Sequence, residues 1–274
     1  TTTSGYGIGG AISVGKASSF TMCGGTVTGG EAKLGGAIGL KNEAVATITG
    51  GTIVSGKGTN GTAIYVNATS NVTIRNAAVV GGTSGTTIWN CGTLTLSGKV
   101  DMPAANFDIM VDGRGGDDCY LDIKELTEVT DPISVRRWVK DAVNDDEGIF
   151  AINATEAQQA MFEAKKAEYY DVVYADGTLQ LQEVACNFFG ANSKGEYVAK
   201  LEDLADLSAA DASITYYRAG RSCDGITIGS SILLDLNGKT LTNVTIPTGV
   251  TVYGMDSTTD DYDCSDGYGT ISGT

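Results

Sequence analysis

The sequence repeats itself in register between Gly9 and Ser97, where three copies begin Gly9-Gly10-Ala11-Ile12, Gly35-Gly36-Ala37-Ile38 and Gly61-Thr62-Ala63-Ile64. These copies are spaced 26 residues apart, and a shorter fourth copy begins Gly85-Thr86-Thr87-Ile88. Apolar residues recur at matching points inside the copies, as at Met22, Ile48 and Ile74. A fixed period that keeps its apolar positions is typical of repeat proteins, in which each unit completes its core by stacking on its neighbour.

Each copy contains three short segments of alternating apolar and polar residues, which in the first copy are Ala11–Val14, Phe20–Met22 and Thr26–Thr28. Alternation with period two is typical of β-strands with one buried face. Three strands per copy with glycine at the corners predict one coil of a parallel β-helix, an all-β solenoid. Leucine-rich repeats would need a different leucine spacing, and propeller blades of about 40 residues do not fit the period.

The coils are expected to extend over residues 1–182, and the last part of this segment, residues 101–182, has an irregular mixed α/β pattern. Thr155 followed by Gln158 is a capping-box pattern that predicts a helix over Thr155–Glu168. Residues 183–196 have the composition of a linker. A second short helix is expected next, with an apolar face of Val198, Leu201, Leu204 and Leu207, and strands then resume within residues 197–274.

One motif in the last part of the chain carries a family resemblance: Leu234-Asp235-Leu236-Asn237-Gly238-Lys239-Thr240-Leu241-Thr242. With the preceding helix, it resembles the helix-capped start of pectin-lyase-like right-handed β-helix domains, in particular those of the repetitive surface proteins of gut Firmicutes. The run Gly9–Ser97 resembles the middle coils of the same domains. The resemblance implies an exported, wall-associated protein, and the wider family also includes polysaccharide lyases and hydrolases.

The order of these parts is inverted, because the helix-capped start of a β-helix follows the regular coils. Reading Asp266–Thr274 directly into Thr1–Gly9 gives a continuous coil pattern. The chain would thus hold the end of one β-helix and the start of another, which residues 1–182 of the next copy complete by end-to-end association. The alternative is an excerpt cut between coils.

Composition narrows the classes of partner and compartment. The chain of 274 residues has a formal net charge of −15, so binding to nucleic acid is not expected. It contains no apolar run long enough to insert into a membrane. The six cysteines have no metal-binding spacing. Cys223 and Cys264 are a candidate disulfide pair, with free, shielded thiols as the alternative.

Catalysis by a β-helix carbohydrate enzyme requires carboxylates that face one cleft. The candidate catalytic residues are Asp108 and Asp112, with Arg114 beside them. The alternative is that these charged residues belong to a solvated loop without a catalytic role. Histidine, the side chain that titrates nearest neutrality, is absent. We therefore expect no catalytic residues and no organic cofactor.

Two further groups are candidate binding residues. An acidic cluster near the C-terminus could supply oxygen ligands to Ca²⁺, although its spacing is not that of an EF-hand; its carboxylates are Asp256, Asp260, Asp261, Asp263 and Asp266. The aromatic residues Tyr6, Tyr65 and Trp89 are expected on the coil exterior, where they could anchor a protein or sugar ligand or cover a corner.

These observations favour a non-catalytic module of an exported bacterial surface protein, located at the cell surface or cell wall. Its expected partner is a host surface or secreted protein, such as an immunoglobulin, or a glycan. A β-helix lyase or hydrolase is the alternative, and a purely structural stalk or head-to-tail filament unit is the third reading.

Overall fold

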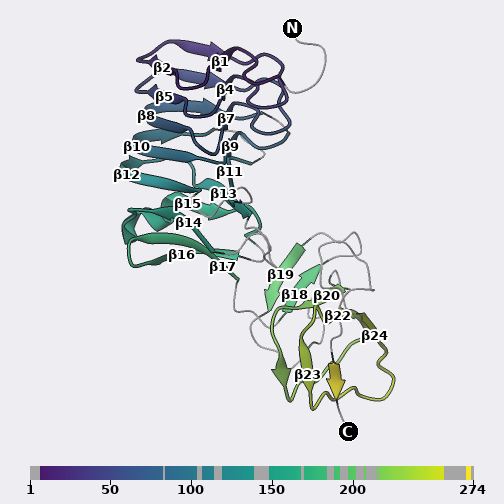
Figure 1. The fold of residues 1–274 in the computed structure, drawn as a ribbon. Helices are drawn as coiled ribbons and strands as arrows, with labels where there is room; N and C mark the ends of the chain where they lie inside the picture. Colours follow the sequence, from purple (N-terminus) through teal and green to yellow (C-terminus); the bar gives the residue numbers. More distant parts are fainter. Residues whose placement is uncertain are drawn as a thin grey trace. The chain divides into compact units, whose positions relative to one another are not determined.

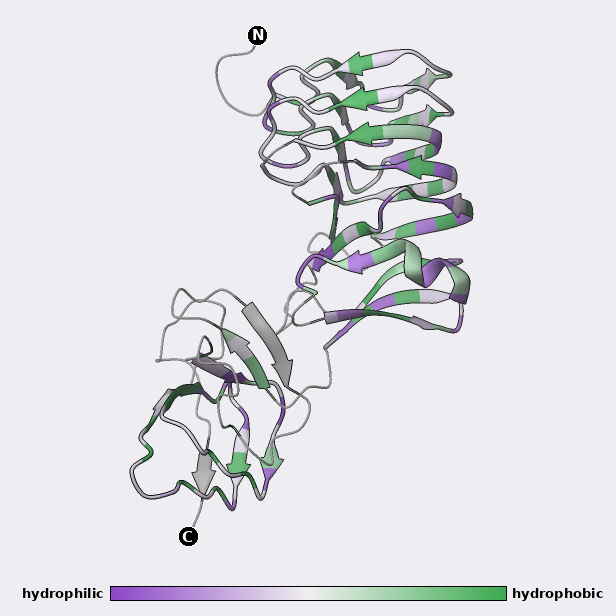
Figure 2. Cartoon of the chain, turned by 180° about the vertical axis from the view of Figure 1, so that it is seen from behind, coloured by the Kyte–Doolittle hydropathy of each residue, from purple (hydrophilic) through white to green (hydrophobic). Residues whose placement is uncertain are grey.

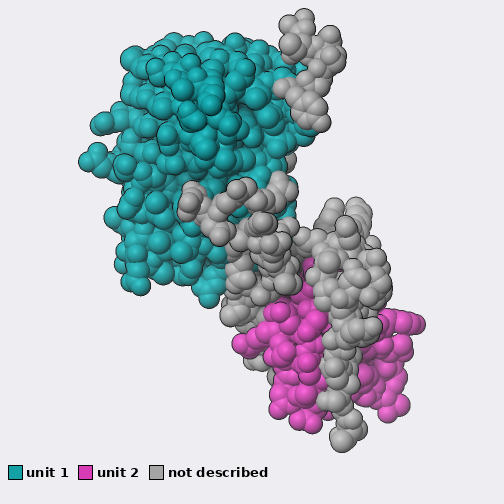
Figure 3. Space-filling view, viewed as in Figure 1, with its two compact units in different colours: residues 1–183 teal, residues 184–274 magenta. Residues whose placement is uncertain are grey.

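The computed structural model divides the chain into two compact units, Thr1–Glu183 and Val184–Thr274 (Figure 3). It describes residues 7–82, 84–103, 107–113, 119–138, 148–167, 170–183, 188–191, 197–201, 207, 214, 216–255 and 270–272. The first unit is a parallel β-solenoid of about five turns, as the repeat predicts.

One wall of the solenoid is a seven-stranded parallel sheet whose strands follow each other in chain order (Figure 1). Its strands are β1 (Ile12–Val14), β4 (Ile38–Leu40), β7 (Ile64–Val66), β9 (Ile88–Asn90), β11 (Ile109–Asp112), β13 (Ile133–Trp138) and β15 (Phe162–Ala164). Each strand pairs with the equivalent strand of the next coil, so that Ile12 pairs with Ile38, and Ile38 with Ile64. The wall thus follows directly from the sequence repeat.

A second sheet forms the opposite wall and closes the end of the solenoid. Its main path is β16 (Tyr170–Ala175), β17 (Thr178–Glu183), β14 (Gly148–Ile152), β12 (Tyr120–Glu128), β10 (Thr93–Asp101), β8 (Asn71–Val80), β5 (Val45–Ile48) and β2 (Ser19–Met22), with β3 (Thr26–Thr28) and β6 (Thr52–Val54) beside it. Coil strands pair in parallel, whereas β14, β17 and β16 pair antiparallel. The coil geometry therefore ends in a hairpin.

The interior of the solenoid is an apolar ladder. Met22 pairs with Ile48 and Ile48 with Ile74, which confirms the stacking that the sequence predicts. Ile48 and Ile74 are fully buried, and Met22 is 6% exposed. Figure 2 shows hydrophobic residues at matching places on successive coils.

The first glycine of each full repeat is required by the backbone. Gly9, Gly35 and Gly61 have φ angles of 73°, 69° and 75°, a left-handed conformation that favours glycine. A Cβ atom on Gly35 would lie 2.1 Å from the carbonyl oxygen of Ile38. The repeat therefore preserves glycine here because no other side chain fits the corner.

The prediction of one helix over Thr155–Glu168 is wrong, because only its first part is helical and a strand follows. The cap forms, since the Thr155 N–H donates to Gln158 Oε1 at 2.8 Å, but the helix is a 3₁₀ segment, η2, over Glu156–Met161. Phe162 pairs with Ile133 and begins β15. Pairing with the exposed edge of β13 overrides the local helical pattern.

The second unit contains two further sheets. The larger has the order β19 (Tyr197–Leu201), β18 (Phe188–Ala191), β20 (Tyr216–Ala219), β22 (Ile232–Asp235) and β24 (Val252–Met255), and the smaller the order β21 (Cys223–Asp224), β23 (Thr240–Thr242) and β25 (Thr270–Ser272). The strands β20, β22 and β24 pair in parallel, as do β21, β23 and β25.

The second predicted helix is wrong over its first residues. Tyr197–Leu201 forms β19, which pairs antiparallel with β18, a strand within the stretch expected to be a linker. Leu204 lies outside the described residues, and Leu207 is buried in the core of this unit. Val198 and Leu201 thus lie in a strand and not in a helix, because β18 offers an edge with which this segment pairs.

Candidate functional site

The outer side of the seven-stranded sheet changes character along the solenoid. Residues in register at the outward phase run Ser13, Gly39, Tyr65, Trp89, Met110 and Arg136. Their neighbours in the strands, such as Ile64 and Ile88, point into the core and are fully buried. Small residues therefore give way from the third coil onward to larger ones: two aromatic residues, a methionine and an arginine.

We call Tyr65, Trp89, Phe107, Met110 and Trp138 the aromatic cluster. Trp89 and Trp138 make an edge-to-face contact with ring centroids 5.2 Å apart, and the Arg136 guanidinium lies 5.6 Å from the Trp138 ring. Trp89 is 8% exposed, whereas Tyr65, Arg136 and Trp138 are half-buried. The expected ligand residues Tyr65 and Trp89 thus lie together, with Trp89 beneath the surface and Tyr65 partly accessible.

Hydrogen bonds fix the cluster to the sheet. The Trp89 Nε1–H donates to Asp112 Oδ2 at 3.0 Å, and the Cys91 Sγ lies 4.0 Å from the same oxygen. Burial, followed by the nearby Cys91 thiol, raises the pKa of Tyr65 to about 12. The Tyr65 hydroxyl, which interacts with the side chains of Cys91 and Asn67, therefore keeps its proton at neutral pH.

The two described carboxylates expected as catalytic candidates are tied to the fold. Asp112 is 8% exposed and holds Trp89. Asp108 Oδ2 accepts hydrogen bonds from the Ser134 N–H and hydroxyl at 2.8 and 2.9 Å, and burial raises the pKa of Asp108.

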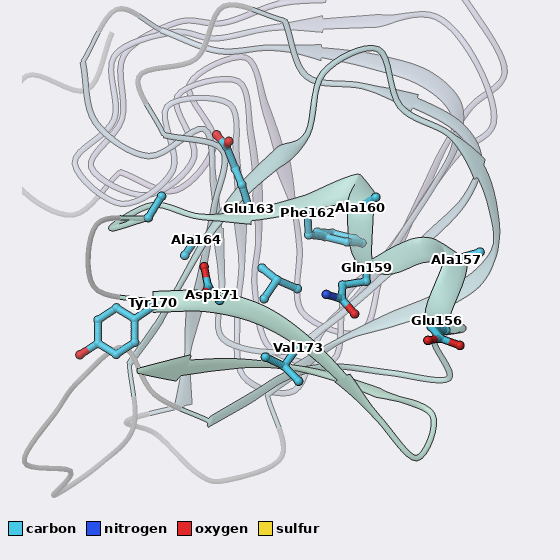
Figure 4. Close-up of a pocket in the computed structure, with 12 residues that line it drawn as sticks. Glu156, Ala157, Gln159, Ala160, Phe162, Glu163, Ala164, Tyr170, Asp171 and Val173 are labelled. Atoms are coloured by element: carbon cyan, nitrogen blue, oxygen red, sulfur yellow. The ribbon is translucent and has the colours of Figure 1, made fainter. Parts of the chain in front are cut away.

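A hollow of about 650 Å³ lies at the last turn of the first unit, between η2, β15 and β16 (Figure 4). Its apolar lining includes Ala157, Ala160, Phe162, Ala164 and Val173. Glu156, Glu163 and Asp171 supply carboxylates to the same lining, and all three are exposed. The sequence does not indicate this hollow, because it arises where the coil gives way to the hairpin.

Several predicted site residues lie outside the described part of the chain: Tyr6, Arg114, the calcium candidates Asp256, Asp260, Asp261, Asp263 and Asp266, and Cys264. Cys223 is described, and its thiol is half-buried. Within the described ranges, no three acidic or cysteine side chains converge as metal ligands. The described helical segments include none that is long and apolar enough to cross a membrane.

Sequence reasoning missed Trp138 and Arg136 as members of the aromatic cluster. Both follow the regular repeats, and Trp138 is separated from Trp89 by two intervening strand pairings, through β11 and β13. Only the register of the sheet brings them together. The spacing of Ser134, Arg136 and Trp138 along β13 indicates that the three side chains share one face of the sheet. It does not indicate whether that face is the one that carries Tyr65 and Trp89.

Comparison of the chain with protein-family models, curated proteins and solved structures gives no significant match. The fold and its surfaces therefore carry the functional inference.

Proposed function

We propose that this chain is a non-catalytic module of an exported bacterial surface protein, which binds a host protein or glycan through the lateral face of its rigid β-helix. The observation that supports the proposal is the aromatic cluster with Arg136, in which the rings of Tyr65 and Trp138 and the Arg136 side chain remain partly exposed. Tryptophan, tyrosine and arginine are enriched where binding energy concentrates.

The cluster suits recognition because its geometry is set before a ligand arrives. Trp89 is held by Asp112 and packed against Trp138, so little side-chain freedom remains to be lost on binding. The half-buried rings of Tyr65 and Trp138 can stack on a sugar or an apolar side chain, and the Arg136 guanidinium can pair with an anionic group.

The placement at the bacterial surface rests on the resemblance of Gly9–Ser97 and Leu234–Thr242 to pectin-lyase-like β-helix domains of gut Firmicutes surface proteins. Binding is favoured over carbohydrate cleavage because Asp108 and Asp112 each serve the fold through hydrogen bonds to Ser134 and Trp89.

The proposal is tested by measuring binding of the whole chain to purified mucin glycoproteins and to secreted immunoglobulins. We expect saturable binding that weakens in Tyr65→Ala and Arg136→Ala. Tyr253→Ala is the matched control, because Tyr253 is 67% exposed and belongs to the second unit. Cleavage of a polyuronide by the chain would instead favour a carbohydrate-active enzyme. Absence of binding to both the mucins and the immunoglobulins would favour a purely structural stalk.

A further inference from the structure

The first coil of the first unit leaves strand edges unpaired among the residues that the structure describes. β1 and β2 stand at the ends of their sheets, and β3 pairs only with β6 (Figure 1). In β2, the Met22 carbonyl oxygen accepts a hydrogen bond from the Thr49 N–H of the second coil at 2.8 Å. Successive residues of a strand direct their backbone groups to opposite edges, so the intervening residues face away from the second coil. All of these residues are exposed: Ser13, Ser19, Thr21, Thr26 and Thr28.

The apolar interior is also uncovered at this end of the solenoid. Ile12, Phe20 and Val27 pack against the core, yet each is partly exposed. The residues that pair with them in the second coil are fully buried: Ile38, Ala46 and Ile53. Repeat proteins normally protect a terminal unit with a polar cap. The described part of the first coil carries no such cap.

The first coil also lacks the features that protect an open edge from pairing. β1, β2 and β3 contain no charged residue and no proline. Lys16 is the one charged residue among residues 7–30 of a chain whose net charge is −15. At the other end of the unit, the antiparallel hairpin of β16 and β17 ends the coils, and the Tyr174 N–H of β16 donates to Gln159 Oε1 at 3.2 Å. The described solenoid is therefore closed at one end and open at the other.

The second unit ends in two strands that offer the complementary edges. β24 pairs in parallel with β22, and β25 with β23, and each is the last strand of its sheet. In a parallel stack, the free edge of a last strand accepts the next coil, whereas the free edge of a first strand accepts the preceding coil. The two kinds of edge therefore fit each other head to tail, as a heterologous contact.

One sequence pattern occurs on both sides of such a contact. β25 places Thr270-Ile271 in register with Thr240-Leu241 of β23. β2 places Thr21-Met22 in register with Thr47-Ile48 of β5. Each ladder repeats a threonine followed by a large apolar residue. Placing Ile271 beside Met22 joins the two ladders into one without a change of pattern.

We propose that the open end of the first coil binds the last coil of the second unit of another copy of this chain. β25 pairs in parallel with β2, which puts Ile271 beside Met22 and Ser272 beside Cys23, and β24 pairs with β1. The contact supplies partners for free backbone groups of the first coil and covers Ile12. Because it is heterologous, it joins copies into chains or rings. It does not involve the aromatic cluster and does not depend on the function proposed for that cluster.

Sedimentation velocity of the whole chain over a range of concentrations tests the association. We expect the weight-average mass to rise above 28.2 kDa as the concentration increases. Ile12→Lys puts a charge at the open end and should weaken association at least about tenfold. Ile149→Lys is the matched control, because Ile149 is 38% exposed in β14 of the same unit, and it should leave association within about twofold. Thermal unfolding checks that both variants are folded.

A cross-link locates the contact without disrupting it. Ser272→Cys places a thiol opposite the exposed Cys23 of another copy, at the strand spacing of about 4.8 Å, which a disulfide can bridge. With oxidised glutathione as the oxidant, we expect disulfide-linked dimers and larger species, with the bond between residues 23 and 272 identified by peptide mass spectrometry. Adding Ile12→Lys should lower the yield of this bond at least about tenfold.

Three results would overturn the proposal. The first is a mass that stays at 28.2 kDa at every concentration. The second is equal association of the wild type and a folded Ile12→Lys variant. The third is the absence of the bond between residues 23 and 272 from the linked species, or its formation only within single copies.

Discussion

Gly35 shows how a single residue type fixes the coil. Its φ angle is 69°, and a Cβ atom there would lie 2.1 Å from the Ile38 carbonyl oxygen. We predict that Gly35→Ala lowers the free energy of unfolding by at least about 2 kcal/mol, through left-handed strain and steric displacement. Urea denaturation measures this change. Gly24→Ala is the control, because no neighbouring atom lies within 4 Å of the added Cβ, and it should shift stability by no more than about 0.5 kcal/mol.

Asp122 gives the fold a pH dependence. Burial by itself raises the pKa of Asp122, but hydrogen bonds from Asn153 at 2.8 Å and Lys124 at 2.9 Å outweigh burial, so the pKa is lowered. A carboxyl whose pKa is lower in the folded state stabilises it above the unfolded pKa of about 3.9, and this contribution is lost as the pH falls through the folded pKa.

We therefore predict that Asp122→Asn destabilises the chain at pH 7 and that the difference from the wild type shrinks as the pH is lowered below about 4. Urea denaturation at a series of pH values measures it. A difference that stayed constant down to pH 2.5 would show that the charge of Asp122 contributes nothing.

At the scale of elements, the strands of successive coils depend on one another through the internal ladder. Ile74 in β8 is fully buried and lies in register between Ile48 of β5 and Leu96 of β10. We predict that Ile74→Ala lowers the free energy of unfolding by about 2–5 kcal/mol, because the cavity has packed neighbours on two coils. Arg75→Ala, at the next and exposed position, should cost less than about 0.5 kcal/mol. Equal losses in the two variants would contradict the ladder.

The same scale shows what the sequence could predict. The 26-residue period predicts the strands, corners and register up to about Ser97, because each element there repeats a local pattern. It does not predict β15 or β19, since Phe162 and Tyr197 lie in segments whose local spacing favours a helix and whose pairing partners, β13 and β18, are defined only by the tertiary fold.

The candidate sites were less predictable than the fold for a related reason. Tyr65 and Trp89 stand out as aromatic residues within the repeat, and both belong to the cluster. Arg136 and Trp138 join them only through the pairing of β9, β11 and β13. The hollow beside β15 has no local sequence signal, because it is formed by two sheet ends.

At the scale of the whole molecule, the first unit is a rigid stack whose outer wall gains aromatic residues along its length, and the second unit has its own core of residues such as Tyr217 and Leu234. A rigid wall with one preorganised cluster is suited to binding a partner without changing it. That interpretation depends on whether the cluster on the wall carries the binding energy.

The most direct test is the equilibrium binding of the whole chain to immobilised mucin glycoproteins and secreted immunoglobulins, compared for the wild type, Tyr65→Ala and Tyr253→Ala. We predict saturable binding to one of these ligands, a Kd raised at least about tenfold by Tyr65→Ala, and no change beyond about twofold for Tyr253→Ala. Absence of saturable binding, or equal Kd values for the wild type and Tyr65→Ala, would contradict it.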